Sequence, residues 1–151
     1  MKRNLLLFLI FMFLCPVVSE AAKTQDELKI KDVFRIYGKR KNVVMVELSK
    51  EMIDIYDITF YKSITIKNDP EALAFIRKCL ENDQKGANKI KEVVSEGGIM
   101  TAYYHIPGNN SPVNRFILFK VSTKGVITLI YLEGELDSDD LITILFAKKD
   151  L

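Results

Sequence analysis

Residues 99–132 read IMTAYYHIPGNNSPVNRFILFKVSTKGVITLIYL, and this stretch decides the fold. It contains three runs rich in β-branched and aromatic residues, at 99–106, 114–122 and 126–132, and such runs are typical of strands. The two connectors, PGNNSP and TKG, are short and rich in turn-forming residues. Short connectors of this kind join antiparallel neighbours, so the sequence predicts a three-strand meander.

Two further strands are expected before the meander. Residues 43–46 are apolar on both faces, which indicates a strand in the centre of a sheet. Residues 57–67 alternate with period two, which predicts a half-buried strand. Its apolar side carries Ile58, Phe60, Ile64 and Ile66, with Lys62 as the one break, and its polar side carries Thr59, Tyr61, Ser63 and Thr65.

Helices are expected at about 25–37, 49–56, 70–81, 87–95 and 138–147. The first has the spacing of a capping box, with Thr24 and Glu27, and Gly38 is expected in the left-handed conformation at its end. Asp69-Pro70 is typical of a helix start, and Ser138 begins the last capping sequence. The helix at 70–81 carries an apolar stripe of Ala72, Phe75, Ile76 and Cys79, and the helix at 87–95 carries Ile90, Val93 and Val94 before Gly97-Gly98.

Helices that come early and a meander that comes late indicate an α+β protein. We expect one five-stranded, largely antiparallel sheet with its helices packed mainly on one face. Residues 22–151 are predicted to form this single domain, because a chain of that length buries enough surface to fold without disulfide bonds or metals.

The N-terminus resembles a secretory signal over residues 1–21. Lys2 and Arg3 precede the unbroken apolar run 5–14, and small residues follow at Ser19 and Ala21, where cleavage is expected. The apolar run is shorter than a membrane-spanning helix requires, so no transmembrane span is expected after processing. A lipoprotein signal acylated at Cys15 is disfavoured, because the large Leu14 precedes this cysteine. We therefore expect export to the periplasm or the outer membrane.

Composition excludes several classes of function. The 151 residues include 22 Lys+Arg and 20 Asp+Glu, and a net charge of +2 gives no electrostatic signature for nucleic-acid binding. One His and two Cys cannot complete a zinc site of four such ligands, and no metal or cofactor is predicted. If the signal is removed, Cys79 is the only cysteine left, and no internal disulfide can form.

The chain resembles the small exported domains of unknown function of Bacteroides-type bacteria. The likeness rests on the apolar and turn pattern of the initial helix, the strand at 43–49 with the short helix after it, and residues 116–121, 127–134 and 136–141. It implies an envelope protein, and it transfers no functional residues because the pattern contains no catalytic signature.

Two constellations could support catalysis. Cys79 and His105 could form a nucleophile and base, but a cysteine on the apolar stripe of a helix is more typical of a core position. A lone histidine such as His105 could also act as a base or pH sensor, although one ordinary hydrogen bond at a strand end explains it equally well. The acidic run Glu133, Glu135, Asp137, Asp139 and Asp140 could bind calcium, but Ile142 occupies the position of the required EF-hand glycine and helix capping explains the acids.

Binding has better support than catalysis. Thr59, Tyr61 and Ser63, with Tyr103 and His105, are predicted to lie on an open sheet face that contacts another envelope protein or a glycan. Plain exposure to solvent is the alternative, and the basic turn at 39–41 is a second possible contact for anionic lipid or glycan. The sequence thus favours a non-enzymatic envelope domain over a small-ligand carrier or a hydrolase-like enzyme using Cys79 and His105.

Overall fold

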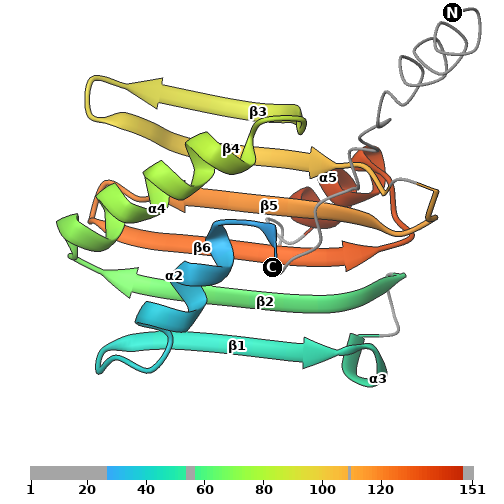
Figure 1. Ribbon diagram of the computed structural model, residues 1–151, viewed down its shortest axis with the longest axis horizontal. Coiled ribbons are helices and arrows are strands. Elements are labelled where there is room, and N and C mark those ends of the chain that lie inside the picture. The colour runs from blue at the N-terminus through green and yellow to red at the C-terminus, as the bar shows by residue number, and fades with distance from the viewer. Residues whose placement is uncertain (1–26, 54–56, 109, 148–151) are drawn as a thin grey trace, which may run out of the picture.

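The computed structural model describes residues 27–53, 57–108 and 110–147. These residues form one antiparallel sheet in the order β1-β2-β6-β5-β4-β3 (Figure 1). The strands are β1 (Val43–Ser49), β2 (Ile58–Lys67), β3 (Asn88–Ser95), β4 (Gly98–Ile106), β5 (Asn114–Val121) and β6 (Val126–Gly134). The helices are α2 (Ile30–Tyr37), α3 (Lys50–Ile53), α4 (Pro70–Asp83) and α5 (Ser138–Ala147). The α+β class is confirmed.

The meander and α4 confirm the predictions made for those segments. β4, β5 and β6 pair in sequence order, as short connectors require. In α4, the side chain of Asp69 accepts a hydrogen bond from the backbone N–H of Ala72 at 2.9 Å, and Pro70 is the first helical residue. Cys79 is buried on the expected stripe beside Ile76.

The prediction of five strands is wrong, because the segment predicted as a helix at 87–95 is strand β3. Ile90, Val93 and Val94 have helical spacing, yet β3 pairs with β4 through a tight connection at Glu96-Gly97. Two register shifts in this pairing, between Lys89 and Lys91 and between Val93 and Val94, break the alternation that marks a regular strand.

The prediction that residues 43–46 lie in a central strand is also wrong. β1 ends the strand order, and Val44 is 62% exposed. Its apolar character therefore does not reflect burial on both faces.

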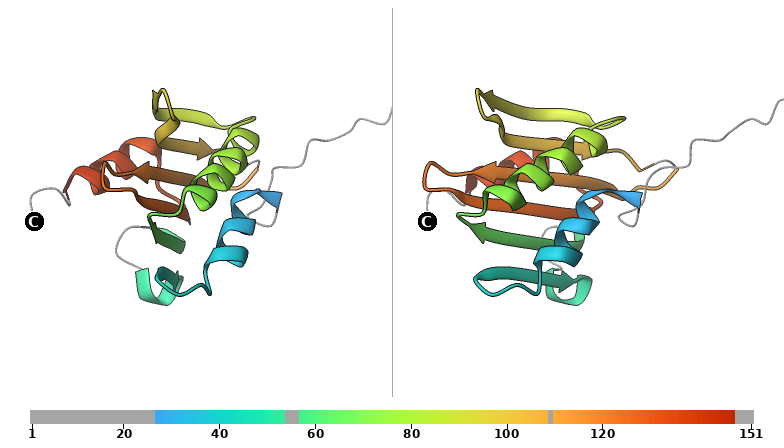
Figure 2. Two further views of the ribbon diagram at one scale, coloured as in Figure 1. Left: turned by 90° about the vertical axis from the view of Figure 1, so that its left-hand side faces the viewer. Right: turned by 60° about the vertical axis from the view of Figure 1, so that its left-hand side comes forward.

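Helices cover both sides of the sheet (Figure 2), with α2 and α4 on one face and α5 on the other. α2 and α4 pack on the face we call the α2–α4 face, where the larger core includes Phe34, Ile64, Ile76, Tyr104 and Leu129. α5 packs on the opposite face, the α5 face. The smaller core there comprises Ile58, Phe116, Leu118, Leu132, Leu136 and Leu141.

A bulge in β2 corrects the predicted alternation. The register with β6 shifts between Ile58 and Phe60, so the two residues lie on opposite faces. Phe60, Ile64 and Ile66 keep the predicted side, whereas Ile58 joins the core under α5. Lys62 lies on the α2–α4 face, 2.9 Å from Glu47 and over the ring of Phe34.

The start of α2 lies later than predicted and is capped by a distant residue. Thr24 lies outside the described residues, and Glu27 precedes the first helical residue, Ile30. The buried carboxylate of Asp83, at the end of α4, accepts hydrogen bonds from the backbone N–H groups of Lys29 and Ile30 at 2.8 and 2.9 Å. α2 and α4 are thereby joined by a long-range cap.

Two other predicted helix ends are corrected. Gly38 is right-handed, with φ −61°, and not left-handed as predicted. Glycine fits there because a Cβ atom would lie 2.5 Å from Sδ of Met45. At α5, Asp137 and not Ser138 caps the helix, since its Oδ1 accepts from the N–H groups of Asp139 and Asp140 at 2.8 and 2.9 Å. The predicted helix at 49–56 is described only as α3, and residues 54–56 lie outside the described residues.

Candidate functional site

The α5 face is divided into a covered part and an open part. α5 packs near the end of the sheet where β4 ends and β5 begins, and it leaves the other end of this face uncovered (Figures 1 and 2). Directly opposed residues of antiparallel strands share a face, and alternate residues along each strand do so as well. The open part therefore includes the polar residues Ser63, Thr65, Lys91, Thr101, Tyr103, Lys120 and Thr128, the apolar Leu118 and Ile130 at its boundary with the covered part, and the exposed Val44, Val46 and Val93 on the two edge strands.

Between the valines of the two edge strands, the open part is mainly polar and cationic. Three threonines and one lysine lie in a row across four neighbouring strands. Thr65 opposes Thr128, Thr128 opposes Lys120, and Lys120 opposes Thr101. Lys120 is exposed, and the ammonium of Lys91 lies 5.9 Å from the ring centre of the half-buried Tyr103. None of the described residues assigned to the open part is an Asp or Glu. Hydroxyls, ammonium groups and an aromatic ring can together bind a polar, negatively charged ligand.

Four of the five residues predicted to bind lie on the α5 face. Ser63 and Tyr103 share one row of paired positions at the boundary of the open part, and Tyr103, like Tyr61, packs against the core beneath α5. Thr59 lies at the bulge of β2, where it has no opposed residue in β6. His105 opposes Phe116 on the covered part, in the same row of paired positions as Tyr61.

His105 helps to hold the segment that leads into α5. Its ring stacks on Phe116 with centroids 5.0 Å apart, and its Nε2 lies 2.9 Å from Oδ1 of Asn114. The amide nitrogen of Asn114 donates to the carbonyl of Leu136 at 3.0 Å. Because the amide oxygen of Asn114 accepts, His105 donates through Nε2–H. This arrangement favours a structural histidine over a catalytic base.

Cys79 and His105 lie on opposite faces of the sheet. Cys79 belongs to the core beneath α2 and α4, and His105 stacks on a core residue of the α5 face. A sheet between the two groups prevents direct proton transfer, so the structure does not bring them together as nucleophile and base.

The surroundings of Cys79 also make its thiol unreactive. Burial, followed by the negative charge of Asp83, raises the pKa of Cys79 to about 11 from 9.0. Only the thiolate is a strong nucleophile, and little of it forms at neutral pH with such a pKa.

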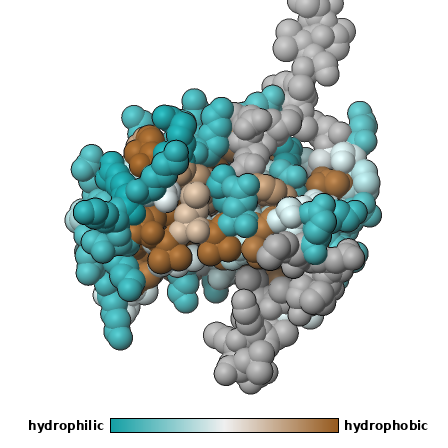
Figure 3. Space-filling model, turned by 90° about the horizontal axis from the view of Figure 1, so that it is seen from below, coloured by the Kyte–Doolittle hydropathy of each residue, from teal (hydrophilic) through white to brown (hydrophobic). Residues whose placement is uncertain are grey.

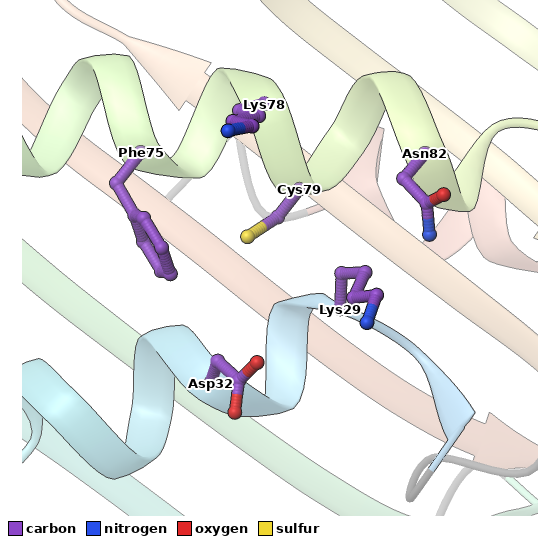
Figure 4. A pocket seen from close by; sticks show the side chains of 6 residues that line it. All are labelled: Lys29, Asp32, Phe75, Lys78, Cys79 and Asn82. Atoms are coloured by element: carbon purple, nitrogen blue, oxygen red, sulfur yellow. The ribbon is translucent and has the colours of Figure 1, made fainter.

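A small hollow lies between α2 and α4 beside this thiol. It has a volume of about 230 Å³ and is lined by Lys29, Asp32, Phe75, Lys78, Cys79 and Asn82 (Figure 4). Clefts that hold small ligands usually measure roughly 300–1,000 Å³. The hollow therefore lends little support to the carrier hypothesis.

The acidic run serves the structure of the chain end. Asp137 caps α5, and Glu133 accepts a hydrogen bond of 2.5 Å from the hydroxyl of Tyr131. No group of three or more His, Cys, Asp or Glu residues suited to a metal occurs within 27–53, 57–108 and 110–147. No helix in those same ranges has the length and apolar character needed to cross a bilayer.

Sequence reasoning missed Lys91, Lys120 and Thr128. The last two could have been found by extending the period-two alternation to residues 114–122 and 126–132, as was done for 57–67. Lys91 could not, because its segment was assigned to a helix.

Comparison with known families gives one match. Residues 17–145 match a family of unknown function (DUF6108). The chain belongs to this family. No curated protein and no solved structure matches the chain. The resemblance to domains of unknown function is thus confirmed. The DUF6108 match includes all six strands described above.

Proposed function

We propose that this DUF6108 protein is an exported, non-enzymatic accessory domain of the cell envelope that binds an acidic glycan. The signal-like pattern of residues 1–21 supports export. Cys79 and His105 lie on opposite faces of the sheet, and burial raises the pKa of the thiol. Both observations favour a binding role over nucleophilic catalysis.

The open part of the α5 face carries the proposal. Its threonines, serine and tyrosine offer donors and acceptors that match sugar hydroxyls, and Lys91 and Lys120 match carboxylate groups. The absence of Asp and Glu from the described residues assigned to this part favours an acidic glycan over a neutral one. Antiparallel sheets often leave one face to solvent, so the charge of the surface is the decisive feature.

The test is a titration of isotopically labelled protein with polygalacturonate oligosaccharides, followed by NMR. We expect shift changes at Thr65, Thr101, Tyr103 and Thr128 and none in α4. A neutral dextran oligosaccharide should bind more weakly, and added salt should weaken binding of the acidic one. Equal binding of both sugars, or changes confined to α2 and α4, would contradict the proposal.

A matched pair of variants tests the charge. Lys120→Glu replaces attraction by repulsion on the open part, and because a surface charge pair is worth roughly 0.2–1 kcal/mol we expect about a fivefold weaker affinity. Lys78→Glu, at an exposed position of α4 on the opposite face of the sheet, has the same charge change away from this surface and should bind as the wild type does. Equal losses in both variants would indicate only a general effect of net charge.

A further inference from the structure

The two edges of the sheet differ in how they are protected. β3 has two register shifts against β4 and carries Lys89 and Lys91, which are features that discourage pairing with another strand. β1 pairs with β2 without any shift from Val43 to Ser49. Its outer side presents unpaired backbone groups, because β1 is the last strand in the order among the described residues.

The first four side chains of β1 are apolar, and three of them are exposed. Val44 is 62% exposed, Met45 38% and Val46 39%. Seen from the β1 edge, apolar side chains gather across the middle of the molecule (Figure 3). A regular, apolar edge strand that is open to solvent is expected to pair with another strand.

We infer that β1 pairs antiparallel with β1 of a second copy, about a two-fold axis through Val46. In such a symmetric ladder one residue must oppose its own copy. With Val46 at the axis, all seven residues of β1 pair, Val44 opposes Leu48, and Met45 opposes Glu47.

Neighbouring registers are less favourable. An axis through Met45 pairs only residues 43–47, because β1 begins at Val43. An axis through Glu47 places two carboxylates directly opposite each other, and like charges at opposed positions destabilise a ladder. Apolar pairing on the α5 face and avoidance of charge repulsion therefore select Val46.

The charges that flank β1 complement this arrangement. The basic turn of Lys39, Arg40 and Lys41 precedes β1, and Glu51, with the exposed Glu47, lies at its other end beside Lys50. Glu47 pairs with Lys62 of its own chain, so the complementary contact is the one that antiparallel pairing brings about between the basic turn of each copy and Glu51 of its partner. This complementarity is what favours a second copy over an extended peptide from another protein.

The first test measures the oligomeric state by sedimentation equilibrium. We expect a reversible dimer for the wild type and a monomer for Val46→Lys, which places two ammonium groups face to face at the axis. Val94→Lys, at a 61% exposed valine on the opposite edge, is the matched control and should remain dimeric. A monomeric wild type, or equal loss of the dimer in both variants with unchanged circular dichroism, would overturn the inference.

The second test fixes the register and does not depend on a lysine variant that folds. In a Cys15→Ser background, Val46→Cys should form an intermolecular disulfide under mild oxidation. Opposed Cα atoms in an antiparallel ladder lie about 4.5 or 5.5 Å apart, which suits a disulfide. Val44→Cys and Val94→Cys should not crosslink to themselves, and preferential crosslinking of either would show that the proposed pairing is wrong. Neither test involves a glycan, so the dimer and the proposed function can fail separately.

Discussion

At the scale of single residues, Asp83 has a structural role that the sequence did not predict. Its carboxylate is buried and accepts from two backbone N–H groups that begin α2. Those groups have no partner inside their own helix, because the first N–H groups of any helix lack an intrahelical acceptor. One side chain of α4 thus determines where α2 begins.

Asp83→Ala is expected to destabilise the fold by about 2–3 kcal/mol, because two donors that are largely shielded from water lose a charged acceptor. Denaturant unfolding should show a lower midpoint. Glu81→Ala, an exposed acidic residue in the same helix, is the control and should change stability by less than about 0.5 kcal/mol. Similar effects in both variants would show that loss of charge, and not of the cap, matters.

Burial of Cys79 predicts a loss of stability in alkali. The folded-state pKa of about 11 lies above the ordinary 9.0, so the unfolded state releases its proton first as the pH rises. The contribution of the buried thiol to the free energy of unfolding is fully present below pH 9. It falls as the pH increases, by about 2 kcal/mol at pH 11. The free energy of unfolding of Cys79→Ala, measured across this range, should decline less steeply than that of the wild type. Parallel curves would show that the thiol does not contribute.

At the scale of elements, the attachment of α5 depends on a short chain of polar contacts. His105 and Asn114 connect β4 and β5 to the carbonyl of Leu136, one residue before the cap of the helix. The apolar side chains of Leu136 and Leu141 then pack on the sheet.

Asn114→Ala should loosen α5 without unfolding the sheet. We expect faster amide hydrogen exchange at 138–143 and unchanged exchange in β6, because the variant removes the side-chain links to Leu136 and His105 and leaves the backbone ladder of the sheet intact. Asn88→Ala, an exposed asparagine of β3, should leave both regions unchanged. Uniformly faster exchange throughout the sheet would contradict a local role for Asn114.

At the scale of the whole molecule, the prediction with the broadest consequence is export. Mass spectrometry of protein isolated from its native cells should find a chain that begins at Ala22, since Ser19 and Ala21 satisfy the small-residue rule for cleavage. A full-length chain in the cytoplasmic fraction would contradict both export and the envelope role. A shorter N-terminal truncation would correct only the cleavage position.

The sequence was sufficient for α4 and for β4 to β6, because their turns and periodicities agree with the tertiary structure. It misled at β3, because Ile90, Val93 and Val94 have helical spacing in the sequence and the bulges in this strand remove the alternation that would mark it. It misled at β1 because an apolar strand can be buried centrally or held at an exposed edge, and local sequence does not distinguish the two. Alternation along the strands was enough to place Ser63 and Tyr103 on one face of the sheet. It could not show that His105 is covered, because the packing of α5 on this face decides that.

The cap that Asp83 places on α2 has a consequence for the order of events during synthesis. The acceptor is made more than 50 residues after the amides that it binds, since Lys29 and Asp83 are 54 positions apart. A nascent chain that ends before Asp83 lacks the carboxylate that completes α2, and short helices are only marginally stable in water without such contacts. Residues 29–37 are therefore expected to stay unfolded until α4 has emerged, which is the state that the proposed export would require.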